Sequence, residues 1–198
     1  MHTLRGLNKG RCLGRLCLLA AAATACAGTP RLVAGLDPLT GVTMTRSSEP
    51  LVLYRDNSGR AAYARDYVYM GPVSVNRMGA YRYFIWLGAW STIQSPDATS
   101  LRDGLETAIL FADGEPLSLD LLGWAPEAVG LSAAPYPSPA ASTIDAYYEV
   151  TIDQIRLISE ARDVRLLTGG ADPANYEPWD AQTMARSGWR AFVDEVGY

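Results

Sequence analysis

The sequence predicts an α+β fold: an antiparallel β-sheet built from hairpins, with two helices near the C-terminus packing on one face. Two observations support it. Turn sequences rich in Gly, Asn and Asp separate short apolar or aromatic runs between residues 41 and 121. After residue 150, a capping-box pattern and an apolar stripe at helical spacing mark helices that start near Ile152 and Asp180.

Three hairpins are expected in the first part of this domain. Their turns are predicted at residues 56–59 (DNSG), at 76–79 (NRMG) and at Asp113-Gly114. Pro72 cannot donate a backbone hydrogen bond, so it indicates a bulge or a sheet edge within the second hairpin. The sheet is therefore expected to be mainly antiparallel.

Residues 81–91 (YRYFIWLGAWS) form the most aromatic stretch of the chain. As a strand, it would present two faces: Tyr81, Tyr83, Ile85 and Leu87 on one, and Arg82, Phe84, Trp86 and Trp90 on the other. Because both faces are mostly apolar, a central strand covered on both sides is the favoured interpretation. An aromatic platform for a glycan is the alternative. Residues 66–70 would pair with this strand and add Tyr67 and Tyr69.

Residues 123–143 are rich in Ala, Pro and Ser and predict a long loop. A solvated connection is the favoured interpretation, and a loop lying over the sheet is the alternative. The segment 145–150 then predicts a strand. Thr151 and Gln154 have capping-box spacing, and Val164–Gly170 predicts another strand. The last helix carries an apolar stripe made of Ala185, Trp189, Phe192, Val193 and Val196.

An acidic segment precedes the last helix. It contains Asp172, Glu177 and Asp180 beside two aromatic residues, Tyr176 and Trp179. A solvated loop leading into a helix is the favoured interpretation, because negative charge suits a helix N-terminus. A Ca²⁺ loop or a carboxylate pair is the alternative, although the spacing of an EF-hand loop is missing.

The N-terminus has the features of an export signal. Residues 1–15 contain four basic residues and no acidic one, and residues 16–25 are apolar or small. This run is too short to span a bilayer, which takes about 20 residues as a helix. Residues 1–25 are therefore expected to be a signal peptide.

Cys26 follows Ala23-Thr24-Ala25 and is the last cysteine of the chain. This arrangement resembles the lipobox of bacterial lipoproteins, which implies cleavage before Cys26 and acylation (palmitate or a similar chain) of that residue. Ala23 stands where the family usually has Leu. Ordinary cleavage at an A-x-A site is the alternative. The resemblance covers only the first 26 residues. It predicts a lipidated tether at 26–37 and a single α+β domain at 38–198, and Ala27 suggests the periplasmic face of the outer membrane.

Composition narrows the chemistry of the part after Cys26. His2 and Lys9 are the only histidine and the only lysine, so a Ser-His-Asp triad, a Schiff base and nitrogen or sulfur metal sites are excluded there. Thirteen basic residues against 21 acidic ones give this part a net charge of −8, which disfavours nucleic acid. No cofactor and no metal are expected.

These observations predict an exported lipoprotein of the cell envelope that is anchored to the membrane by its N-terminal lipid. We expect an accessory or binding protein that acts through contacts with a protein or a glycan. A carboxylate-based periplasmic hydrolase of an envelope glycan is the alternative, because Asp and Glu remain available for catalysis. Catalysis is the less favoured of the two.

Overall fold

The structure is a computed structural model that describes residues 31–59, 61–93, 98–170 and 173–197. Its strands are β1 (Leu32–Leu36), β2 (Thr43–Ser47), β3 (Leu51–Asp56), β4 (Arg65–Arg77), β5 (Ala80–Ser91), β6 (Ile109–Ala112), β7 (Glu115–Ser118), β8 (Asp120–Gly123), β9 (Ile144–Val150), β10 (Val164–Thr168) and β11 (Ala174–Pro178). Its helices are α1 (Ala98–Glu106), the 3₁₀ turn η1 (Pro126–Val129), α2 (Ile152–Glu160) and α3 (Thr183–Val196). The two C-terminal helices, α2 and α3, confirm that part of the prediction.

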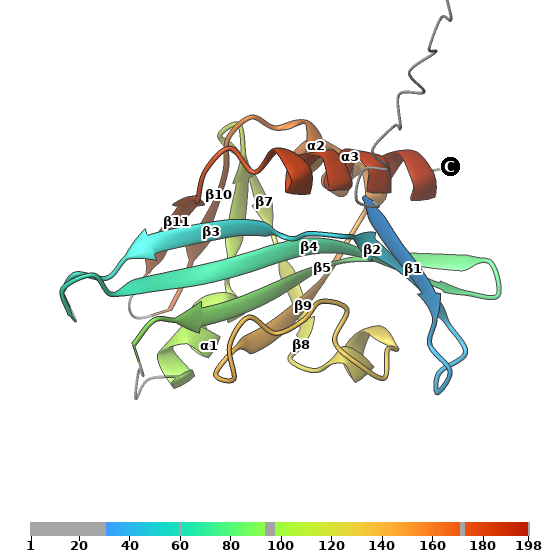
Figure 1. The fold of residues 1–198 in the computed structure, drawn as a ribbon, viewed down its shortest axis with the longest axis horizontal. Helices are drawn as coiled ribbons and strands as arrows, with labels where there is room; N and C mark the ends of the chain where they lie inside the picture. Colours follow the sequence, from blue (N-terminus) through green and yellow to red (C-terminus); the bar gives the residue numbers. More distant parts are fainter. Residues whose placement is uncertain (1–30, 60, 94–97, 171–172, 198) are drawn as a thin grey trace, which may run out of the picture.

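The strands form one antiparallel sheet, in which nine follow the order β7-β6-β10-β11-β3-β4-β5-β9-β8. Off this path, β2 pairs with β4 and β1 pairs with β2. Its two outermost strands, β7 and β8, are consecutive in the chain and are separated only by Leu119. The sheet is therefore nearly closed and barrel-like (Figure 1). Antiparallel pairing was predicted, whereas the closure and the helix α1 were not.

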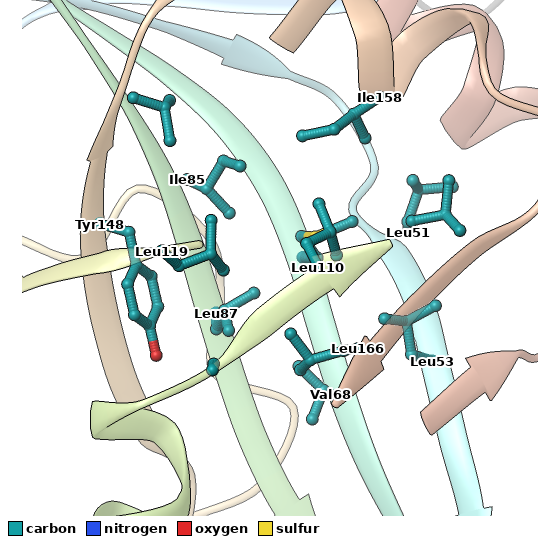
Figure 2. Packing of buried hydrophobic residues seen from close by; sticks show 14 of the residues in the cluster. Leu51, Leu53, Val68, Ile85, Leu87, Leu110, Leu119, Tyr148, Ile158 and Leu166 are labelled. Atoms are coloured by element: carbon teal, nitrogen blue, oxygen red, sulfur yellow. The ribbon is translucent and has the colours of Figure 1, made fainter. Parts of the chain in front are cut away.

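The hydrophobic core lies inside this curved sheet. Figure 2 shows inward-facing side chains from strands far apart in the sequence, such as Leu53, Val68 and Leu166, meeting there. Helices α2 and α3 contribute Ile158 and Trp189 to the same core. The two helices therefore bury their apolar sides against the same core as the curved sheet.

Local signals were confirmed at the hairpins and at one helix start. The turns between β4 and β5 and between β6 and β7 have positive φ at Met78, Gly79, Asp113 and Gly114. Thr151 and Gln154 form the predicted capping box. The turn after β3 is longer than predicted, because β4 begins only at Arg65.

Pro72 occupies a gap in the partners of β4. Along one side of this strand, β3 pairs as far as Met70 and β2 pairs from Val73 onward. Gly71 and Pro72 therefore have no paired residue opposite them on that side. This position explains why a proline is tolerated inside a long central strand.

Two segments differ from their predicted state. The acidic segment interpreted as a solvated loop contains β11, which pairs with β10 and β3, and α3 starts at Thr183 instead of near Asp180. Turn residues and short length concealed this strand, and one of its two partners, β3, is distant in the sequence. Residues 32–36, within the expected tether 26–37, form β1 and pair with β2.

Asp37 joins the turn after β1 to the segment 124–143. Its carboxylate accepts hydrogen bonds from the Ser132 backbone N at 2.6 Å, the Ser132 hydroxyl at 2.8 Å and the Leu39 backbone N at 3.0 Å. The backbone hydrogen bond from Ser132 is the main reason that the pKa of Asp37 falls from 3.8 to about 2. Its ionised form is therefore the one that holds the two segments together.

This pKa shift predicts a pH dependence of stability. Since the pKa is lower in the folded protein than in the unfolded one, the contact stabilises the fold above about pH 4 and is lost as the pH falls toward about 2. Asp37→Asn keeps an acceptor oxygen but cannot titrate. Urea unfolding at stepped pH should show a shallower loss of stability for Asp37→Asn than for the wild type and for the exposed-site control Asp120→Asn. Equal slopes for all three would contradict the assignment.

Candidate functional site

A row of three aromatic side chains crosses the outer face of β3, β4 and β5. Tyr54 lies opposite Tyr67, and Tyr67 lies opposite Trp90. Their neighbours Leu53 and Val68 point into the core, so strand alternation directs the row outward. The rings of Tyr67 and Trp90 stack with centroids 4.8 Å apart and planes 17° apart. The row is thus a continuous aromatic strip on the sheet.

Trp179 lies against one end of this row. Its backbone N donates to the Val52 carbonyl at 2.9 Å, which holds the residue beside β3. Its ring meets the Tyr54 ring edge-on at 5.1 Å and the Tyr67 ring at 5.6 Å. Trp179 remains 40% exposed, the most accessible ring at this place.

Arg65 adds a cation to the same surface. Its guanidinium lies 5.1 Å from the centroid of the Trp179 ring and 5.8 Å from that of Tyr54. Asp56 accepts from its Nε at 2.9 Å and holds it there. We define the aromatic surface as six residues: Tyr54, Arg65, Tyr67, Tyr69, Trp90 and Trp179.

The chain covers the neighbouring part of the same sheet face with its own segment 124–143. Tyr136 from this segment is fully buried and stacks on Trp86, with ring centroids 4.8 Å apart. Its hydroxyl lies 2.9 Å from the Ser47 hydroxyl and donates to the Pro72 carbonyl at 3.0 Å. The segment therefore lies over the sheet, which was the alternative to the favoured solvated connection. Of the aromatic surface, Tyr69 packs against the cluster that contains Tyr136.

A glycine in β4 makes room for this cover. A Cβ at Gly71 would overlap the ring of Tyr136. In the part of the chain that the structure describes, no segment like 124–143 lies over the row formed by Tyr54, Tyr67 and Trp90, whose half-buried side chains are met by Trp179 and Arg65. One part of this sheet face is thus covered by the segment 124–143, whereas no described segment covers the part that carries the row.

Residues singled out by sequence end up in different places. Trp86 is a core residue, as the structural interpretation of this strand predicted. Its indole N donates to Asp145 at 3.0 Å. Burial raises the pKa of Asp145, and this hydrogen bond opposes the increase. Trp90 and Trp179 come together around Tyr67.

Other predicted residues do not join this surface or cannot be placed. Glu177 is exposed on β11, and Asp180 follows Trp179 in an exposed position with positive φ. Cys26 and Asp172 lie outside the described residues. Tyr54 and Arg65 were missed, because only the register of β3 against β4 shows that they lie beside Tyr67 and Trp179.

Several carboxylates that could have served catalysis stabilise the fold instead. Asp66 is buried and accepts from Arg55 at 2.8 Å and from Asn57 at 2.9 Å. Asp37 and Asp145 are held by Ser132 and Trp86, as described above. Within the described ranges, no group of three or more His, Cys, Asp or Glu side chains is placed to hold a metal ion.

A hollow adjoins the aromatic surface beyond Val52, which pairs with Tyr69. Its lining residues are Glu49, Pro50, Val52, Gln182, Thr183, Met184 and Ala185. Gln182 bridges to β3 by donating to the Val52 carbonyl at 2.8 Å. A concave region with apolar lining residues thus lies next to the aromatic surface.

Comparisons of the chain with protein-family models, with curated proteins and with solved structures give no match. Among the helices of the described residues, none is long and apolar enough to cross a membrane.

Proposed function

We propose that the protein is an exported, lipid-anchored protein of the cell envelope that holds a protein partner on its aromatic surface. The observation that supports a binding role is the row of Tyr54, Tyr67 and Trp90, which no segment of the described residues covers in the way that 124–143 covers the sheet region beside it. Tyr, Trp and Arg are the residues that most often dominate the energy of protein interfaces. The aromatic surface consists of these three residue types only.

The arrangement of the rings favours a protein over a glycan. A sugar ring stacks on an open aromatic face, whereas Tyr67 and Trp90 stack on each other and the Arg65 guanidinium lies over Trp179. The adjoining hollow lined by Val52 and Met184 can accept an apolar side chain of a partner. A hydrolase lacks comparable support, because Asp37, Asp66 and Asp145 are each held by donors of the fold.

Trp179→Ala tests the binding role. Truncating an accessible tryptophan that dominates an interface is expected to cost about 2 kcal/mol or more of binding free energy, a loss of roughly 30-fold in affinity. The partner is first recovered by crosslinking the anchored protein in cells, and its affinity for each variant is then measured. Leu122→Ala is a matched control, because Leu122 is also 40% exposed but lies on β8.

Two results would contradict this proposal. Equal affinities of the two variants would show that the partner does not bind at the aromatic surface. Recovery of a glycan, with turnover that is abolished by changing one or two Asp or Glu residues, would favour the hydrolase.

Cys26→Ser tests the lipid anchor. Since the thiol is the proposed site of acylation, the variant should lose the acyl chains and either remain uncut or leave the membrane. Mass spectrometry of the N-terminal peptide from the membrane fraction measures this directly. A variant that is still processed and still membrane-bound would show that the anchor lies elsewhere.

A further inference from the structure

Two hairpin tips at one end of the sheet carry exposed apolar side chains. Leu36 and Leu39, at the tip between β1 and β2, are 68% and 83% exposed. Met78 and Tyr81, at the tip between β4 and β5, are fully and 53% exposed. These four are half of the large hydrophobic residues found exposed in the described part of the chain.

The strand register places the two tips side by side. Leu36 pairs with Thr43, Thr43 with Asn76, and Asn76 with Tyr81, so one row across the sheet contains residues of both hairpins. With neighbouring strands about 4.8 Å apart, this row is only about 15 Å wide. Figure 1 shows both hairpins projecting from the same side of the molecule.

The charge of the tips differs from that of the remaining domain. Residues 36–43 and 76–82 contain two arginines, Arg77 and Arg82, and one acid, Asp37. Arg82 pairs with Glu149 at 2.9 Å, and the ionised Asp37 offsets the charge of Arg77. The tips are thus apolar and close to neutral in a chain whose part after Cys26 carries a net charge of −8.

We propose that the two tips insert into the headgroup boundary of the lipid bilayer. Exposed Leu and Met can enter the acyl region, while Tyr and Arg suit the headgroup level. This inference rests on the proposed anchor at Cys26. Six residue steps separate Cys26 from Leu32 and span at most about 22 Å, whereas β1 from Leu32 to Leu36 covers about 13 Å. The acyl chains can therefore reach the bilayer that the tips contact.

This orientation would place the aromatic surface away from the membrane. Ten residue steps along β4 separate Tyr67 from Arg77, a distance of about 33 Å at strand rise. A partner bound at Trp179 would then be held well above the lipid headgroups.

Photo-crosslinking in isolated membranes tests the proposal on the full chain. Leu39, Met78 or Tyr63 is replaced by p-benzoylphenylalanine, and lipid adducts are identified by mass spectrometry. Tyr63 is a matched control for Met78, because it is 96% exposed and also has positive φ, but it precedes the opposite end of β4. We expect phospholipid adducts at positions 39 and 78 and at least about tenfold fewer at 63, because tips inserted by about 5–10 Å contact acyl chains.

The acylation state of Cys26 is read from the same samples. Acylated protein without lipid adducts at the tips would overturn this inference and leave the anchor intact. Lipid adducts at the tips of unacylated protein would overturn the anchor and support the inference. Adducts to a protein instead of lipid at 39 and 78, or equal lipid adducts at 63, would also overturn it.

Discussion

Trp189→Ala is expected to lower the free energy of unfolding by about 3–5 kcal/mol, the usual cost of removing a large aromatic side chain from a core. Trp189 is fully buried in α3 and belongs to the same core as residues of the curved sheet. Its loss opens a cavity between the helix and the sheet interior, which a rigid sheet can fill only in part. Urea unfolding of the two proteins at neutral pH measures the difference.

Met184→Ala is the control on the same helix. Met184 is 46% exposed, so its truncation should cost less than about 1 kcal/mol. A similarly small cost for Trp189→Ala would mean that α3 does not close the core as described.

Gly71→Val should have the second large effect, of about 3 kcal/mol or more. The new side chain would overlap the buried ring of Tyr136, and overpacking alone costs about 1–3 kcal/mol. If the segment 124–143 is displaced, the burial of Tyr136 is lost as well, which adds about 1.5–3 kcal/mol. Limited proteolysis should then cut within this segment, and urea unfolding gives the total loss.

A double-mutant cycle identifies the cause. In a Tyr136→Ala background, Gly71→Val should cost much less, because the overlapping ring is absent. Gly35→Val is a control, since a Cβ at Gly35 meets nothing within 4 Å. An unchanged cost in the Tyr136→Ala background would show that Gly71 is needed for another reason.

Local sequence signals were sufficient for the elements that depend on neighbouring residues. The stripe of Trp189 and Phe192 predicted α3, and the capping box at Thr151 predicted the start of α2. The Asp113-Gly114 turn predicted the hairpin of β6 and β7, because its left-handed φ values suit these two residues.

Elements that depend on partners far away in the chain could not be predicted from the sequence. β11 is short and bounded by turn residues, and only its pairing with β3 and β10 makes it a strand. The same limit applies to the candidate site. Trp90 and Tyr67 were predicted to lie on paired strands, but the long connection before Arg65 concealed that Tyr54 is opposite Tyr67. Trp179 joins them only because the chain returns to β3 after more than a hundred residues.

The position of β11 between β3 and β10 has a consequence for the order of assembly. The hairpin of β4 and β5 can pair as soon as its residues are available, but the other edge of β3 stays unpaired until Glu177 and Pro178 arrive beside it. Since loop closure over such a separation is slow, the last steps of folding should be the docking of the C-terminal segment and the burial of α3. Until then, β3 presents an open strand edge next to an uncovered core. A chain interrupted before residue 174 would keep both, and would be prone to aggregate through them.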